Sequence, residues 1–179
     1  MAELAGTYEL GPANGRVLVR TGREGLAARV GHDLVLEVTK WSARVVVPAS
    51  GDLSAASVSA SLDLGSLVVR EGSGGAKPLT DRDRREIEKQ ARKSLGSSAM
   101  ASFTSSQVSP LKGEVEGTLT LWETSRAFRF PVTEPEPGHY RGSAALKQSD
   151  FGITPYSGFF GALKLRDEVT VDFEVTVSA

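Results

Sequence analysis

The sequence predicts an all-β protein with a single helix, built as one eight-stranded antiparallel barrel that the helix covers at a side or an end. Three observations lead to this prediction. Apolar and polar residues alternate with a period of two over most of the 179 residues, turn sequences divide these runs into about eight strands, and one segment has a helical pattern instead. The length fits a single domain, which we expect to span residues 1–179.

The alternating runs are expected to be strands with one buried face and one face in solvent. Gly-Pro, Asn-Gly and Ser-Pro pairs, and the EPEPG sequence at 134–138, mark turns between them. The positions expected to face inward are, in chain order, Val17 and Val19; His32, Leu34, Leu36 and Val38; Val58, Ala60, Leu62 and Leu64; Val115, Gly117, Leu119 and Leu121; and Val169, Val171, Phe173, Val175 and Val177.

Residues 79–96, LTDRDRREIEKQARKSLG, depart from this alternation and predict a helix of about four turns. Thr80 is a suitable N-cap, Asp83 follows it three residues later as in a capping box, and Gly96 can end the helix. The apolar stripe of this segment is narrow and the remaining positions are charged. We therefore expect a mostly solvated helix that lies along one edge of the sheet.

Composition excludes several classes of function. The 21 basic and 22 acidic residues give a net charge of −1, so we expect no basic field that could steer nucleic acid or an anionic membrane. The absence of cysteine excludes disulfides, thiolate nucleophiles and cysteine-based metal sites.

Targeting signals are missing as well. The N-terminal sequence MAELAGTYELGP lacks the features of a signal peptide, and no apolar run approaches the roughly 18 residues of a transmembrane helix. We expect no integral membrane span and a cytoplasmic location, or an exported one if a leader precedes this sequence.

His32, which is followed by Asp33, is the main candidate for polar chemistry. Neighbours on a strand point to opposite faces, so these two side chains cannot act together. The simpler interpretation is a histidine hydrogen-bonded to the backbone; the alternative places it at the barrel mouth as a contact for a ligand head group. Because the only other histidine is His139 and neither has metal-site spacing, we expect no metal and no catalytic residue.

The order of the segments is informative beyond their periodicity. The most specific are SVSASLDLGSL at 57–67, VEGTLTL at 115–121 and QSDFGITPYSGFFGALKLRDEVTVDFEV at 148–175. With them the chain resembles the YceI-like family of polyisoprenoid-binding, lipocalin-like proteins over nearly its whole length. The resemblance implies a lipocalin-like barrel with an elongated apolar tunnel, and no enzymatic activity. The tunnel would hold an isoprenoid lipid, such as a polyprenyl or quinone-like amphiphile, with no other cofactor.

Under this resemblance the ligand contacts would be apolar side chains on inward positions, with a polar contact and a loop at the ends. The expected contacts are His32, Leu34, Leu36, Val58, Ala60, Leu62, Phe103, Leu119, Leu121, Phe128, Phe130, Phe151, Tyr156, Phe159 and Phe160. In the Gly-Phe-Phe-Gly loop the glycines permit sharp turns. Its aromatic rings either gate one end of the tunnel or seal that end as core.

Three hypotheses on function remain open from the sequence. The preferred one is a non-enzymatic carrier of an isoprenoid-type lipid, which predicts a continuous tunnel. The second is an enzyme that acts on such an amphiphile with His32 as acid or base, which predicts His32 inside the cavity next to a perturbed carboxylate. The third is a packed structural or interaction barrel without a ligand, which predicts no cavity and is compatible with a homodimer.

Overall fold

The computed structural model describes residues 4–96, 99–158 and 161–177, and these contain three antiparallel sheets and one α-helix. The first sheet has the order β1-β5-β6-β8-β9-β10 and the second the order β11-β12-β15-β2-β4-β7. The strands of the first sheet are β1 (Gly6–Leu10), β5 (Trp41–Val47), β6 (Ser57–Asp63), β8 (Met100–Ser109), β9 (Glu114–Leu121) and β10 (Thr124–Pro131). Those of the second are β11 (Thr133–Glu136), β12 (His139–Lys147), β15 (Glu168–Thr176), β2 (Gly15–Thr21), β4 (Asp33–Val38) and β7 (Leu67–Ser73).

A small third sheet joins β13 (Ser157–Gly158), β14 (Leu163–Leu165) and β3 (Arg23–Glu24) near one end of the molecule. The all-β class with one helix is therefore confirmed. The expected count of eight strands in a single closed sheet is not, because the described residues form fifteen strands in three sheets. The larger number arises in part from these two- and three-residue strands, which carry no periodic signal of their own.

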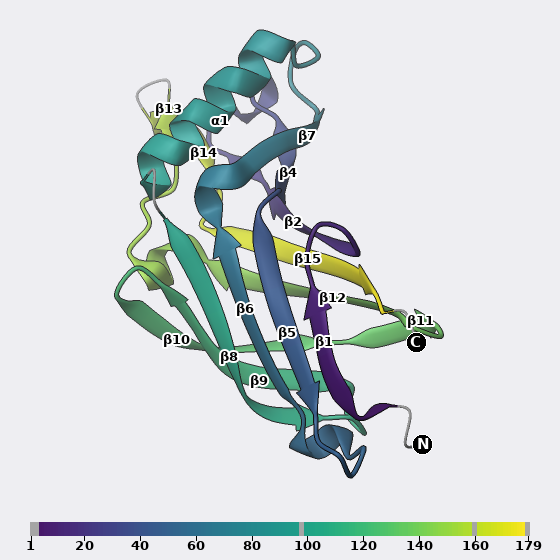
Figure 1. The fold of residues 1–179 in the computed structure, drawn as a ribbon. Helices are drawn as coiled ribbons and strands as arrows, with labels where there is room; N and C mark the ends of the chain where they lie inside the picture. The colour runs from purple at the N-terminus through teal and green to yellow at the C-terminus, as the bar shows by residue number, and fades with distance from the viewer. Residues whose placement is uncertain (1–3, 97–98, 159–160, 178–179) are drawn as a thin grey trace.

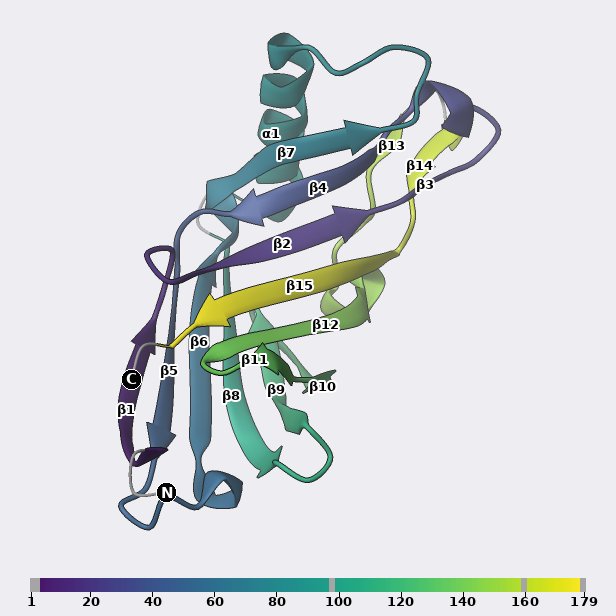
Figure 2. The ribbon, with the colours of Figure 1, turned by 90° about the vertical axis from the view of Figure 1, so that its right-hand side faces the viewer.

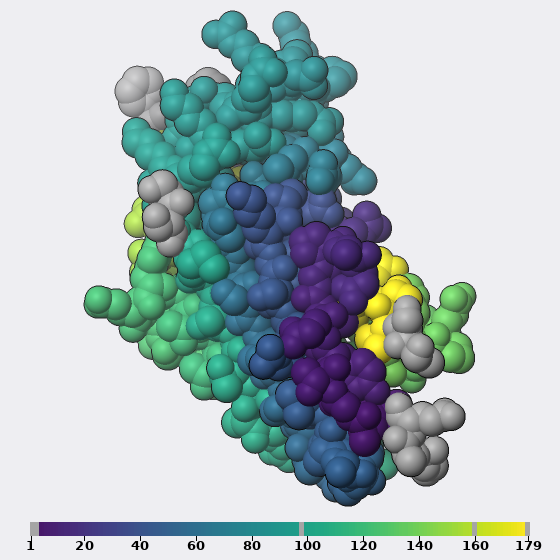
Figure 3. All heavy atoms as spheres, in the orientation of Figure 1, coloured from purple at the N-terminus to yellow at the C-terminus, as the bar shows by residue number. Residues whose placement is uncertain are grey.

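The two large sheets face each other with their strands running across one another, as Figures 1 and 2 show. β1, at the edge of the first sheet, lies beside the C-terminal end of β15 in the second (Figure 3). A backbone hydrogen bond of 2.8 Å from Thr176 to Asn14, in the turn between β1 and β2, ties the chain together on this side. The inward faces of both sheets consequently enclose the interior of the molecule.

Each sheet contributes one cluster of buried apolar residues, as the alternation predicts. The first cluster centres on Phe103, Leu119 and Leu121, and the second on Leu36, Val38 and Val69. Leu62 and Leu95 pack against both clusters. The core is thus divided between the sheets rather than concentrated at one centre.

The helix α1 (Asp81–Leu95) forms where the sequence predicts it. The hydroxyl of Thr80 accepts from the backbone N–H of Asp83, and the Asp83 carboxylate accepts from that of Thr80, so the capping box is complete. Gly96, with φ +90°, ends the helix in a region that favours glycine.

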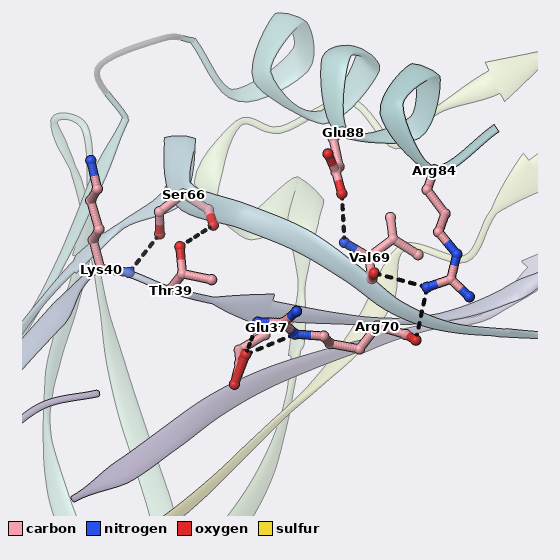
Figure 4. A network of polar contacts seen from close by, with 8 residues as sticks. All are labelled: Glu37, Thr39, Lys40, Ser66, Val69, Arg70, Arg84 and Glu88. Carbon is pink, nitrogen blue, oxygen red and sulfur yellow. Dashed lines mark hydrogen bonds and ion pairs between the residues drawn. The ribbon is translucent and has the colours of Figure 1, made fainter. Parts of the chain in front are cut away.

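Side chains of α1 attach it to β7, the edge strand of the second sheet (Figure 4). The Glu88 carboxylate accepts a hydrogen bond of 3.0 Å from the Val69 backbone N–H, and the Arg84 guanidinium donates to the carbonyls of Val69 and Arg70. These contacts satisfy backbone groups that an uncovered edge strand would expose. None of the helix residues is fully buried, but Ile87 and Leu95 pack against the core clusters at the end of the sheets that α1 covers.

Asp172 lies on the outer face of the second sheet. Its carboxylate accepts hydrogen bonds from side chains on both neighbouring strands, β12 and β2. Partial burial raises the pKa of Asp172, but hydrogen bonds from Ser143 Oγ (2.6 Å) and from the Arg20 guanidinium outweigh burial and hold the pKa below its usual value. A depressed carboxylate pKa contributes stability above the unfolded-state pKa, and this contribution is lost as the pH falls through the folded-state pKa.

We expect Asp172→Asn to lower the free energy of unfolding by about 1 kcal/mol at neutral pH, because a charge-assisted hydrogen bond is lost. The variant should also lose less stability than the wild type between neutral pH and about pH 3. Urea unfolding at both pH values measures this, with Glu168→Gln, at an exposed acid of the same strand, as the control. An equal acid-induced loss in wild type and Asp172→Asn would contradict the assignment.

Candidate functional site: a cavity between the sheets

A continuous cavity of about 1520 Å³ lies between the two large sheets. It is larger than the roughly 300–1,000 Å³ of ordinary small-molecule pockets. Its lining reaches exposed residues at both ends, with Val30 and Tyr156 near α1 and with Leu4 and Leu53 at the opposite end. The cavity therefore extends from the α1 end of the molecule to the opposite end.

Twelve of the fifteen expected contact residues line this cavity. They are His32, Leu34, Leu36, Val58, Ala60, Leu62, Phe103, Leu119, Leu121, Phe128, Phe130 and Tyr156. Phe151 does not belong to the lining; it is buried at 3% exposure in the core cluster of the first sheet, beside Ile153. Phe159 and Phe160 lie outside the described residues, so whether they gate or seal the tunnel stays a prediction.

Strand register explains which side chains reach the cavity and why space remains there. Ala60 in β6 is opposite Ala43 in β5 on one side and Phe103 in β8 on the other, and all three face inward. Ala144 of β12 faces the cavity from the other sheet. Small side chains at mid-strand positions leave volume that leucine or phenylalanine would fill.

Four aromatic rings meet inside the molecule and connect the two sheets. Phe103, Phe128 and Phe130 of the first sheet have ring centroids 5.2–6.3 Å apart, and Phe130 lies edge-on to Phe173 of the second sheet at 5.5 Å. Such edge-to-face pairs are a favourable aromatic geometry. The rings line the cavity wall and present an apolar, polarisable surface to anything inside it.

Two glycines make room for this aromatic cluster. A Cβ atom on Gly117 would collide with the Thr104 carbonyl and the Phe103 ring, and one on Gly142 would collide with the Phe173 ring and the Pro131 carbonyl. Both glycines are thus required by close approach rather than by an unusual backbone angle.

His32 lies at the α1 end of the cavity, and its surroundings favour the simpler of the two interpretations. Its Nε2 lies 2.6 Å from the Lys77 carbonyl oxygen, so this ring nitrogen is engaged by backbone. The charged partner nearby is Asp83, whose pKa is lowered chiefly by the Thr80 backbone N–H and hydroxyl of the capping box. The shift at Asp83 therefore reflects helix capping and does not identify an acid–base pair.

The other end of the cavity is bounded by Tyr140, where burial raises the pKa of the phenol and its hydrogen bond to Glu134 raises it further. Within the described ranges no group of three or more histidine, aspartate or glutamate side chains is placed to hold a metal ion. None of the described helices has the length and apolarity needed to cross a bilayer.

The sequence prediction missed one wall of the cavity. The helix lies along the edge strand β7 as expected, and its apolar stripe, Ile87, Ala91 and Leu95, also lines the cavity. Asp83 and Glu86 line the same end, which gives it a polar margin. The stripe was visible at 3.6-residue spacing, but the surface that it faces depends on tertiary structure, which residue spacing does not show.

One family model and two solved structures are similar to this chain. The YceI-like domain matches residues 8–177, almost the whole chain. The crystal structure of Burkholderia cenocepacia BcnA has 17% sequence identity and a TM-score of 0.64, covering 94% of this chain and 99% of that one. A mutant CJ YCEI protein crystallised for nanotechnology applications has 14% identity and a TM-score of 0.44, covering 80% and 85%. No curated protein matches the chain.

Proposed function

The chain belongs to the YceI-like family, and from this premise we propose that it binds and carries one long apolar ligand of the isoprenoid type without chemical conversion. In this proposal the two large sheets act as the two halves of one lipocalin-like barrel. Their shared interior is the ligand site.

The observation that carries the proposal is the cavity itself. A continuous volume of about 1520 Å³, walled by inward-facing aliphatic and aromatic side chains from both sheets, suits an elongated apolar molecule. Burial of hydrocarbon contributes about 0.8 kcal/mol per CH₂ group, so a chain of isoprene units binds tightly without directed polar contacts. The cavity argues against the hypothesis of a fully packed barrel, which predicts no cavity.

The polar margin near α1 suggests how the ligand is oriented. His32, Asp83 and Glu86 line the cavity there, whereas the middle is walled by residues such as Ala60 and Phe103. We propose that a hydroxyl or carbonyl head group lies near α1 and the apolar tail extends between the sheets. The Lys77 carbonyl occupies His32 Nε2, which argues against acid–base catalysis by this ring nitrogen.

Mass spectrometry of an organic-solvent extract from gently purified protein tests the proposal. We expect a prenyl or quinone-like species at close to one molecule per chain, and none from a packed β protein of similar size prepared in parallel. Protein that arrives empty and also fails to take up added polyprenol or quinone would overturn it. An acyl lipid in the extract would overturn the isoprenoid assignment but would still support the carriage of an apolar ligand.

A further inference from the structure

The α1 end of the molecule brings together three connections that are distant in sequence. They are residues 22–32 between β2 and β4, residues 74–96 with α1, and the described residues 148–158 and 161–167 between β12 and β15. Backbone hydrogen bonds of 2.8 Å join Arg166 to Gly22 and Ala27 to Ala162. Figures 1 and 2 show α1, β13 and β14 at the same end of the molecule.

Exposed apolar side chains surround the cavity at this end. Leu26 is 99% exposed, Val30 48% and Tyr156 42%, and the last two also line the cavity. Single exposed apolar residues are common on protein surfaces. Here, however, the turn that carries Leu26 is held by the hydrogen bond from Ala27 and by the pairing of β3 with β14, so the leucine is fixed in an exposed position.

Charge is segregated toward the same end. The three connections together carry a net charge of +4, in a chain whose net charge is −1, so the remainder carries −5. Arg29, Lys77 and Lys164 are exposed and form no ion pair within the described part of the chain. On the outer sheet faces, Arg20 and Arg70 are paired with carboxylates, whereas the exposed Arg126 and Arg141 have no ion pair among the described residues. The overall charge balance of the sequence conceals this local excess.

We infer that the α1 end docks on an anionic lipid bilayer and that the cavity is loaded from the bilayer there. Unpaired cations complement anionic head groups, and exposed leucine, valine and tyrosine suit the interfacial layer. An isoprenoid that leaves the bilayer at this point enters the cavity without crossing water. The inference rests on the proposed ligand, since it explains how so apolar a molecule reaches the cavity.

The opposite end of the molecule offers matched controls. Leu111, in the turn between β8 and β9, is as fully exposed as Leu26, and Lys112 beside it is an exposed cation like Arg29. Neither Leu26 nor Arg29 lines the cavity. Substitution at these four positions therefore tests the surface without altering the proposed ligand site.

The experiment is flotation of purified protein with vesicles of phosphatidylcholine, with and without phosphatidylglycerol. We expect binding only to the anionic vesicles, weaker at high salt. We expect Leu26→Asp and Arg29→Glu each to lower the partition coefficient, about tenfold for the leucine, while Leu111→Asp and Lys112→Glu leave it unchanged. Equal losses at both ends, or equal binding to neutral vesicles, would overturn the inference.

Uptake of a short isoprenoid alcohol from solution, without vesicles, separates this inference from the proposed function. We expect Leu26→Asp to bind the alcohol as the wild type does and to lose only uptake from vesicles. If the wild type takes up the alcohol from solution but does not bind vesicles, docking is overturned and the proposed ligand is not. No uptake from solution by the wild type would overturn the proposed ligand, and docking as its loading step would fall with it.

Discussion

Ala60→Phe is expected to abolish retention of the ligand while leaving the fold intact. Ala60 lies in the middle of β6, faces the cavity and is flanked by Ala43 and Phe103, so the added ring projects into the empty volume between the sheets. Because the ring fills space rather than displacing neighbours, the free energy of unfolding should change by less than about 1 kcal/mol.

Extraction followed by mass spectrometry, combined with urea unfolding, measures both effects. Ala127→Phe is the matched control, because Ala127 lies exposed on β10 and does not line the cavity. The control should carry ligand at the wild-type level. Wild-type occupancy in Ala60→Phe would show that the ligand is held elsewhere, since the obstructed cavity could not accommodate it.

Gly142→Ala is expected to lower the free energy of unfolding by about 1–3 kcal/mol, the usual cost of overpacking. The new methyl group would collide with the Phe173 ring and with the Pro131 carbonyl oxygen, and the latter belongs to backbone that cannot move aside easily. Phe173 in turn contacts Phe130 across the two sheets, so its displacement disturbs the aromatic cluster.

Urea unfolding of a small variant set tests this explanation. Ala145→Val, at an exposed position of the same strand, should be nearly neutral. Gly142→Ala should lower the free energy of unfolding less in a Phe173→Leu background than in the wild type, because only the collision with the carbonyl then remains. A neutral Gly142→Ala would contradict the close packing of β12 against β15.

The sequence predicted the local features well because their causes are local. The capping box of Thr80 and Asp83, the end of α1 at Gly96 and the inward faces of β4, β6, β9 and β15 all follow from residue spacing. The strand count was not predictable in the same way. β3 is only two residues long and forms because β14 lies beside it in space, and the ladder between β4 and β7 shifts register between Val35 and Leu36.

The residues that line the cavity were largely predictable, whereas the shape of the cavity was not. Alternation shows that Leu34 and Leu62 face inward, but not how far apart the sheets stand, and this separation determines whether the interior is core or cavity. Phe151 was wrongly placed in the lining because it belongs to a short 3₁₀ turn (Gln148–Phe151), where strand alternation does not apply. The excess of basic residues around α1 depends on tertiary neighbours and is invisible in the net charge.

Titration with isoprenoid alcohols of increasing length tests the central claim most directly, because it measures whether the ligand's hydrocarbon is buried along the cavity. Competition against a fluorescent apolar probe gives the dissociation constant for each alcohol. We predict that each added five-carbon unit tightens binding by about tenfold or more until the cavity is filled, after which the affinity levels off. Affinities that do not change with chain length would contradict binding between the two sheets.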